Sequence, residues 1–182
     1  MWKNNGIDEV QKSLLEKNTI SLGGEVDHDM FLYVREALLR LIGRGSPAIT
    51  VLITSRGGSV KCGLDIYDAL RSYPGEKTII VHAYACSMAA VILQSGTRRV
   101  AMRHADILIH HIQQEQISLD VIRSPAEIAK MRNVMEKDQL RIYEILAGRT
   151  KRTVAEIQRV CVKDRKMTSE QAKALRLIDE IR

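Results

Sequence analysis

The segment Thr78–Gly96, TIIVHAYACSMAAVILQSG, joins a β-branched run, a turn of small residues and an apolar run. Residues 78–84 have the composition of a buried strand. Residues 88–93 are apolar at every position, as in a fully buried helix. Ser87 therefore lies at a predicted strand-to-helix turn. There a hydroxyl projects beside helical amides that have no intrahelical acceptor, which suits a nucleophile in acyl transfer. A serine in this position is also a common helix N-cap.

Length and composition predict a single domain spanning residues 1–182 with a largely aliphatic core, because 45% of the residues are hydrophobic and only 4% aromatic. The net charge of +6 is spread along helical segments among acidic residues, which indicates solvated surface and no nucleic-acid site. No membrane-spanning run, signal peptide or metal-ligand spacing is apparent. We therefore expect a cytoplasmic protein with no metal, no cofactor and no membrane partner.

Cys86 stands next to Ser87 and is an alternative nucleophile. Strand alternation sends neighbouring side chains to opposite faces, so Cys86 is expected to point away from the serine and to fill a buried position.

Strand and helix patterns alternate before this segment. We expect a loose segment over 1–6, a helix over 7–17, a strand over 19–22, a turn at Gly23-Gly24, a helix capped by Asp27 or Asp29, a strand over 48–54 and a helix over 60–73. Repeated strand–helix units predict an α/β fold with a mainly parallel sheet and right-handed crossovers.

The segment Ser55–Ser59, SRGGS, places paired glycines between a strand and a helix. Glycines there allow backbone amides to approach a ligand closely. A phosphate cradle is an alternative, but the lysine of the Walker motif and the three-glycine dinucleotide pattern are missing. A simple tight turn is the other interpretation.

Short strands over 98–102 and 107–112 are expected after Gly96, and alternation sends His110 and His111 to opposite faces, so that only one faces the serine. Three helices with their own start signals follow. They are a long helix opened by Ser124-Pro125-Ala-Glu127 and ending at Gly148, and two helices opened by Thr153–Glu156 and Thr168–Gln171. Asp164 lies in the polar link between the last two, where an aspartate alone indicates only a surface charge.

Together these motifs resemble the proteolytic subunit of Clp protease (ClpP), from about Ile7 to Ile181. The matching segments, in order, are LGGEV (22–26), ITSRGGSV (53–60), ACSMAA (85–90), ILIHH (107–111), KDR (163–165) and MTS (167–169). The resemblance implies a ClpP/crotonase-like fold. It also implies a serine endopeptidase that cleaves peptides or unfolded proteins inside a homo-oligomeric ring, a heptamer or double heptamer, with a handle segment at about residues 113–148.

The resemblance also implies roles for individual residues. Ser87 falls on the family's nucleophile, His110 rather than His111 on its general base, and Asp164 on its aspartate. The backbone amides of Gly58 and Met88 fall on its oxyanion donors, and Gly57 and Ile112 on substrate-binding positions. Independent chemistry agrees, because a base beside a serine and two amides beside its target carbonyl are the parts of acyl transfer.

Several positions depart from the family. Arg56 replaces a proline, Ala89 a glycine, and His111-Ile112 a Gln-Pro pair. The departures also include a glycine-free segment Gln113–Arg123 in place of a glycine-rich strand, only Met1–Gly6 in place of an axial hairpin, and Thr50 and Leu52 in place of tyrosines. They leave open whether two rings stack and whether a Clp-type ATPase is a partner.

Three other functions stay open at this point. They are a non-catalytic ClpP-like ring subunit, a crotonase-type acyl-CoA enzyme, and a phage capsid-maturation peptidase.

Overall fold

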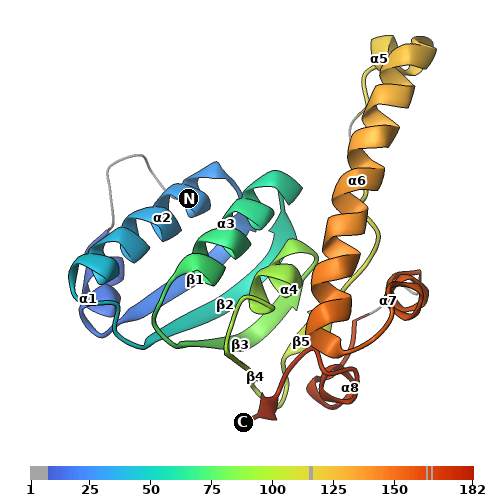
Figure 1. Cartoon of the computed structure of the whole chain (residues 1–182). Coiled ribbons are helices and arrows are strands. Elements are labelled where there is room, and N and C mark those ends of the chain that lie inside the picture. Colours follow the sequence, from blue (N-terminus) through green and yellow to red (C-terminus); the bar gives the residue numbers. More distant parts are fainter. Residues whose placement is uncertain (1–7, 115–116, 163, 165) are drawn as a thin grey trace.

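The computed structural model describes residues 8–114, 117–162, 164 and 166–182, so the expected loose segment Met1–Gly6 lies outside the described residues. Figure 1 shows a twisted sheet with three helices packed along it and a long helix that projects from the body. The elements in chain order are α1 (Glu9–Glu16), β1 (Thr19–Val26), α2 (His28–Gly43), β2 (Ile49–Gly58), α3 (Val60–Ser72), β3 (Lys77–Cys86), α4 (Met88–Leu93), β4 (Arg98–Ala101), β5 (Asp106–Leu108), α5 (Leu119–Arg123), α6 (Pro125–Thr150), α7 (Val154–Cys161), α8 (Ser169–Ala174) and β6 (Glu180–Ile181).

The sheet has the strand order β1-β2-β3-β4-β6, and β5 pairs with the far end of β3. In the described part of the chain each of these strand pairs is parallel. Parallel neighbours need crossover connections, which helices α2, α3 and α4 supply between successive strands. The predicted α/β fold with a parallel sheet is confirmed.

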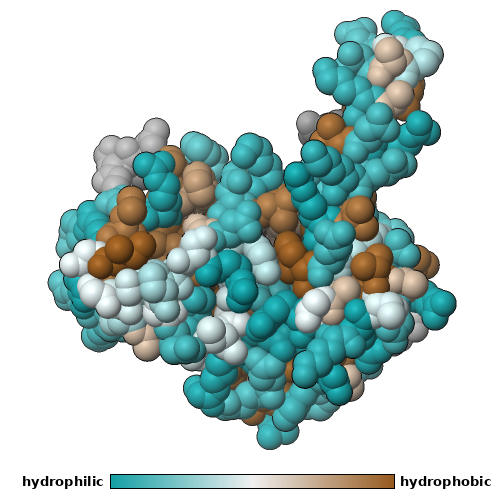
Figure 2. Space-filling view, in the orientation of Figure 1, coloured by the Kyte–Doolittle hydropathy of each residue, from teal (hydrophilic) through white to brown (hydrophobic). Residues whose placement is uncertain are grey.

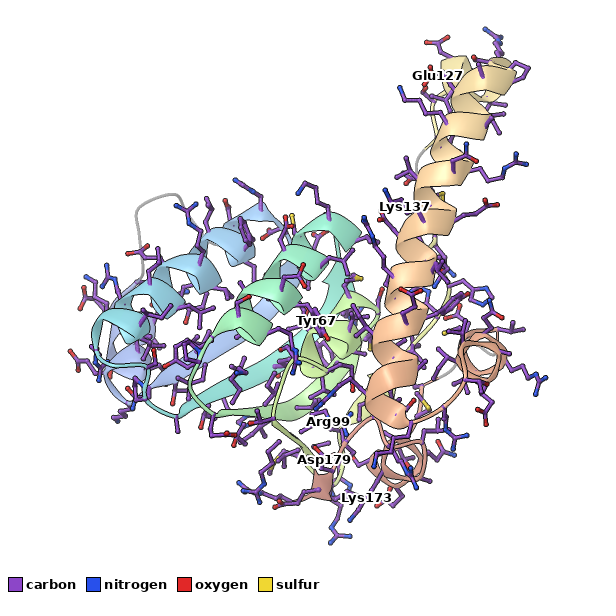
Figure 3. All side chains as sticks on the ribbon, in the orientation of Figure 1. Tyr67, Arg99, Glu127, Lys137, Lys173 and Asp179 are labelled. Atoms are coloured by element: carbon purple, nitrogen blue, oxygen red, sulfur yellow. The ribbon has the colours of Figure 1, made fainter. Side chains whose placement is uncertain are left out.

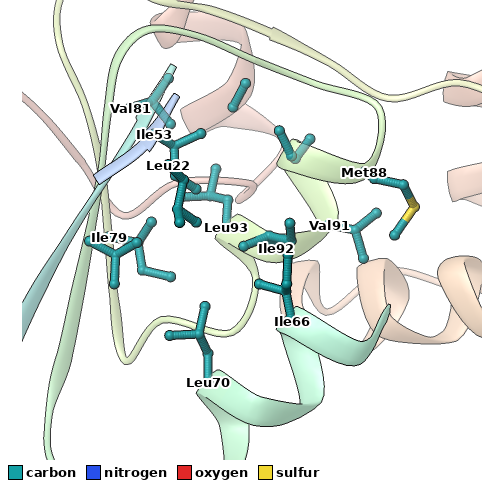
Figure 4. Close-up of a cluster of buried hydrophobic side chains, with 14 of the residues drawn as sticks. Leu22, Ile53, Ile66, Leu70, Ile79, Val81, Met88, Val91, Ile92 and Leu93 are labelled. Carbon is teal, nitrogen blue, oxygen red and sulfur yellow. The ribbon is translucent and has the colours of Figure 1, made fainter. Parts of the chain in front are cut away.

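The core lies between the sheet and helices α2 to α4. Alternate residues of the central strands point into it, and Figure 4 shows Leu22, Ile53 and Ile79 facing side chains of α3 and α4. Helix α4 is buried on all sides, since every residue from Met88 to Leu93 is at most 2% exposed. A helix apolar at every position can only be stable where it is fully covered, so the sequence pattern of α4 and its burial agree.

Helix α4 packs closely because α3 carries a glycine where the two helices meet. A β-carbon on Gly63 would lie 2.6 Å from the terminal methyl carbon of Met88. The missing side chain lets Met88, the residue after Ser87, sit directly against α3. Packing against α3 therefore fixes the position of the first residue of α4.

Two predictions about strands are wrong. Gly23 and Gly24 do not form a turn: β1 continues through them to Val26, with a bulge between Gly23 and Glu25 and Gly24 at φ 92°. The strand predicted over residues 107–112 ends at Leu108. Gly23 and Gly24 stay in β1 because a bulge accommodates them. After Leu108 the chain leaves the sheet, so β5 ends where its pairing with β3 ends.

The helix predictions are closer to the structure. Asp27 caps α2 by accepting a hydrogen bond from the Met30 amide, and capping boxes open α7 at Thr153 and α8 at Thr168. The long helix α6 ends at Thr150 and not at Gly148, and the short helix α5 was not predicted.

Helix α6 packs against the body through its C-terminal part. Ile142, Leu146 and Ala147 are buried there, whereas Ile128 and Val134 on the projecting part are exposed. Figure 2 shows a mostly hydrophilic surface on that part, interrupted by separate hydrophobic residues. Among the described residues, no helix combines the length and apolar character needed to cross a membrane.

A buried arginine ties the last strand to the sheet. Arg99 on β4 is 5% exposed, and its guanidinium donates to both carboxylate oxygens of Asp179 and to Gln94 Oε1 at 2.6 Å. Figure 3 shows Arg99 and Asp179 close together at the lower end of the sheet. Burial opposes ionisation of Asp179, but the hydrogen bonds from Arg99 outweigh it and hold the pKa of the carboxyl below its usual range.

Asp179→Asn is expected to lower the free energy of unfolding by about 2 kcal/mol, because it leaves the Arg99 charge buried without a carboxylate. The value is below that for a fully buried pair since Asp179 is 41% exposed. The folded-state pKa is depressed, so the contribution is fully present above about pH 4 and is lost as the pH falls through the folded value. Urea unfolding at pH 7 and pH 3 measures it. The exposed variant Asp68→Asn serves as the control, and an equal loss at both pH values would contradict the assignment.

Candidate active site

Ser87 lies on the sharp turn between β3 and α4. Its backbone has φ 54° and ψ −126°, a left-handed conformation that costs energy for a residue with a side chain. Its amide donates to Leu108 O at 2.9 Å, and its carbonyl accepts from the Ala90 amide. The hydroxyl makes no capping hydrogen bond, so Ser87 occupies the N-cap position without acting as a side-chain cap. The hydroxyl is left available on the cleft side of the turn.

Gly57 of β2 lies directly against this turn, and Gly58 lies against β1. A β-carbon on Gly57 would lie 2.7 Å from Ser87 Cβ and 3.0 Å from the Met88 nitrogen, and one on Gly58 would lie 2.5 Å from Val26 O. Both glycines have positive φ, 97° and 151°. Only glycine fits such contacts, so the end of β2 approaches the serine and the first amide of α4 with bare backbone.

Two long-range contacts bring the segments of Ser87, His110 and Asp164 together. The Ser87 amide is bonded to Leu108, two residues before His110. Ile107 and Met167 form an antiparallel bridge, with Ile107 N to Met167 O at 2.9 Å and Met167 N to Ile107 O at 2.7 Å. The bridge is isolated, and it brings the segment that carries Asp164 alongside the segment that carries His110.

The distance from His110 Nδ1 to Asp164 Oδ1 is 3.8 Å, longer than a hydrogen bond. His110 Nδ1 is buried and has no hydrogen-bond partner among the described residues. The Asp164 side chain is 52% exposed, its backbone has φ 40°, and its Oδ2 accepts from Gln113 Nε2 at 3.4 Å. The carboxylate therefore faces the imidazole but does not bond to it in this structure.

His111 borders the same cleft as His110 and also packs against α6. Its ring meets Tyr143 of α6 edge-on, with ring centroids 6.0 Å apart, and its Nε2 is buried without a hydrogen-bond partner among the described residues. The strand that was predicted to separate the two histidines ends at Leu108, and both border the cleft, so the predicted divergence is not confirmed.

A cleft of about 620 Å³ joins these groups. Its wall contains Ser87, Met88, both glycines of β2, His110, Ile112 and Gln113, and its apolar part is formed by Val60, Val91, Ile109, Ile142 and Leu146. Six of the seven residues predicted for the site border this cleft, and the seventh, Asp164, lies next to His110 behind it. A hydroxyl, an imidazole and amides at a helix start, beside an apolar pocket, are the groups that acyl transfer to a bound chain requires.

Cys86 does not border the cleft and is buried, as expected of a filler residue. Burial raises the pKa of its thiol, and the nearby charges of Lys166 and Arg56 offset this only in part. The thiol is therefore protonated at neutral pH, which argues against Cys86 as the nucleophile.

Two site contacts were not predicted. Gln113 reaches Asp164, and Gln139 of α6 accepts a hydrogen bond from the Ile112 amide at 2.5 Å. Gln139 is far from Ile112 in sequence, and a glutamine within a helix gives no local signal that it will bond to another segment.

Comparison with known proteins agrees with this architecture. The family model for Clp protease matches residues 3–182. Among similar proteins, the ATP-dependent Clp protease proteolytic subunit 3 of Rhodococcus jostii is 31% identical over 178 residues, which is 96% of this chain and 85% of that protein. Proteolytic subunit 3 of Streptomyces avermitilis is 32% identical over 96% of this chain and 78% of its own length. Proteolytic subunit 1 of Corynebacterium jeikeium is 31% identical over 96% and 92%.

The chain belongs to the Clp protease family. Its relatives match it over nearly its whole length, and the parallel sheet with its C-terminal helices is the fold that the motifs predicted.

Proposed function

We propose that this chain is a ClpP-type serine endopeptidase that cleaves peptides or unfolded proteins through Ser87, His110 and Asp164. The observation that carries the proposal is the joint placement of these three residues. Ser87 and His110 border one cleft, and the Asp164 carboxylate faces the other side of the imidazole at 3.8 Å. The three residues are far apart in the sequence, and it is the fold that brings them together.

In the proposed reaction, His110 removes the proton from the Ser87 hydroxyl as the oxygen attacks the scissile carbonyl carbon. The amides of Met88 and Gly58 stabilise the oxyanion of the tetrahedral intermediate. His110 then passes the proton to the leaving amine as the C–N bond breaks. Water, activated by the same imidazole, hydrolyses the ester on Ser87 and frees the serine.

In this reaction the Asp164 carboxylate accepts a hydrogen bond from Nδ1–H of His110. Its negative charge stabilises the imidazolium that forms during each step. The distance of 3.8 Å must shorten by about 1 Å for a hydrogen bond, and such contacts commonly tighten when substrate binds. The exposed position of Asp164, next to Lys163 and Arg165 in sequence, leaves room for this movement.

The proposal includes the assembly. We treat residues 1–182 as one ClpP-like peptidase domain that forms a homo-oligomeric ring in the cytoplasm, with the segment of about 113–148 as the handle between subunits. Helix α6 supports this role, because much of its projecting part is not covered by its own chain. Native mass measurement gives the number of subunits, for which one or two heptameric rings are the expected values.

The proposal is tested by a fluorophosphonate probe, read by intact mass. Wild-type protein is expected to gain one adduct per chain, and Ser87→Ala is expected to gain none because the nucleophilic oxygen is removed. Cys86→Ala is the matched control: it changes the neighbouring residue and is expected to keep the adduct.

A folded oligomer that gains no adduct would contradict the proposal and would favour a non-catalytic ring subunit. Labelling that is lost in Cys86→Ala and kept in Ser87→Ala would assign the nucleophile to the thiol. An acyl-CoA enzyme would be recognised by thioester turnover that survives Ser87→Ala.

A further inference from the structure

The chain that follows β5 leaves the sheet and runs beside α6 toward α5 (Figure 1). A hydrogen bond joins the start of this segment to α6: the Ile112 amide donates to Gln139 Oε1 at 2.5 Å. Gln139 lies two residues beyond Lys137, which Figure 3 labels on the middle of α6. The contact therefore joins the start of the segment after His110 to a point well along the long helix.

This contact is the second of two anchors around His110. The first is the Ile107–Met167 bridge, three residues before the histidine. The second is the Ile112 amide, two residues after it. Ile109, which lies between the two anchors, is buried. The backbone is therefore held on both sides of His110. The Gln113 to Asp164 contact further along the same segment is a longer hydrogen bond, at 3.4 Å.

The orientation of the Gln139 amide is set by this bond. A backbone N–H can only donate, so the oxygen of Gln139 must face Ile112. Its Nε2 is then buried with no hydrogen-bond partner among the described residues. An unpartnered buried N–H group costs free energy, and a hydrophobic residue would avoid this cost if packing were the only role of the position.

We propose that Gln139 is a positioning residue for His110: it holds the Ile112 amide on α6 and so fixes the distance between the imidazole and Ser87. The inference rests on the proposed function. If Gln139 has this role, the position of α6 affects the active site, because a movement of α6 on the body would also move Ile112 and with it the backbone after His110.

The test compares three variants of the full-length protein in rate of fluorophosphonate labelling and in hydrolysis of a short fluorogenic peptide. Gln139→Met keeps the length and removes the acceptor, and Gln139→Asn keeps the amide but is too short to reach. Both are expected to lose about 10- to 100-fold in labelling rate and in kcat because the histidine is displaced, and KM is expected to rise less than kcat falls because most of the cleft wall belongs to other segments. Gln139→Glu keeps an acceptor oxygen at the same reach and is expected to recover to within about threefold of wild type.

Gln158→Met is the matched control: Gln158 of α7 lines a second pocket beside α6 together with Gln139, and among the described residues its side chain has no hydrogen bond to Ile112. Wild-type labelling separates the two hypotheses. If wild type labels at Ser87 and Gln139→Met labels equally fast, the positioning role is wrong and the proposed function stands. Equal losses in Gln139→Met and Gln139→Glu would also overturn it, because the acceptor would then not matter. A wild type that does not label would refute the proposed function itself.

Discussion

His110→Ala is expected to lower the rate of peptide hydrolysis by about 10⁴- to 10⁶-fold and to abolish fluorophosphonate labelling on the same time scale. The reason is chemical: without an imidazole beside it, the Ser87 hydroxyl keeps its proton at neutral pH and is a weak nucleophile. The fold should survive, because His110 Nδ1 makes no hydrogen bond within the described chain and its loss breaks none. Rates from long time courses, together with thermal unfolding, measure both statements.

His111→Ala is the control for this variant, since it removes the same group from the adjacent position. His111 packs on Tyr143, so its loss should cost some stability and leave most of the activity. The reverse pattern, with His111 essential and His110 dispensable, would mean that the general base has been assigned to the wrong residue of the pair.

Gly57→Ala is expected to reduce labelling and hydrolysis by at least about 100-fold and to lower the unfolding temperature. The added methyl group would lie 2.7 Å from Ser87 Cβ and 2.8 Å from Cys86 O, and the backbone φ of 97° disfavours any side chain. Neither neighbour is a flexible side-chain end, so the nucleophile turn itself must shift. The variant thus moves the serine and the Met88 amide together.

Gly148→Ala is the matched control, because the residue is inside α6 and, outside its chain neighbours and its own helix backbone, no atom of the described residues lies within 4 Å of the added β-carbon. Alanine there should leave activity unchanged and raise helix stability by about 0.5–1 kcal/mol. Full activity in Gly57→Ala would show that the turn tolerates a side chain and that the close approach of β2 to Ser87 is not required.

The sequence predicted what is encoded locally. The apolar run of α4, the strand before it and the capping residues of α2, α7 and α8 were found because burial and capping follow directly from side-chain type. The errors came where tertiary contacts override local preference. Gly23 and Gly24 resemble a turn, but pairing with β2 draws them into a bulged strand, and α5 has too few residues to show a helical period.

The candidate site shows the same division. Ser87 could be proposed from its position between a strand and a buried helix, and the paired glycines from their spacing. Asp164 could not, because an aspartate in a polar link carries no signal, and only the family resemblance singled it out. The contact that sets it beside His110 is the bridge between Ile107 and Met167, which joins segments sixty residues apart and leaves no trace in either one.

That bridge has a consequence for the chain during its synthesis. The bridge to Ile107 forms only after Met167 has left the ribosome, so a growing polypeptide that already contains Ser87 and His110 still lacks the segment that brings Asp164 to the imidazole. The proposed triad is therefore complete only after translation has passed residue 167. Nascent copies on the same messenger would pass most of their time on the ribosome as inert polypeptides, unable to cut one another.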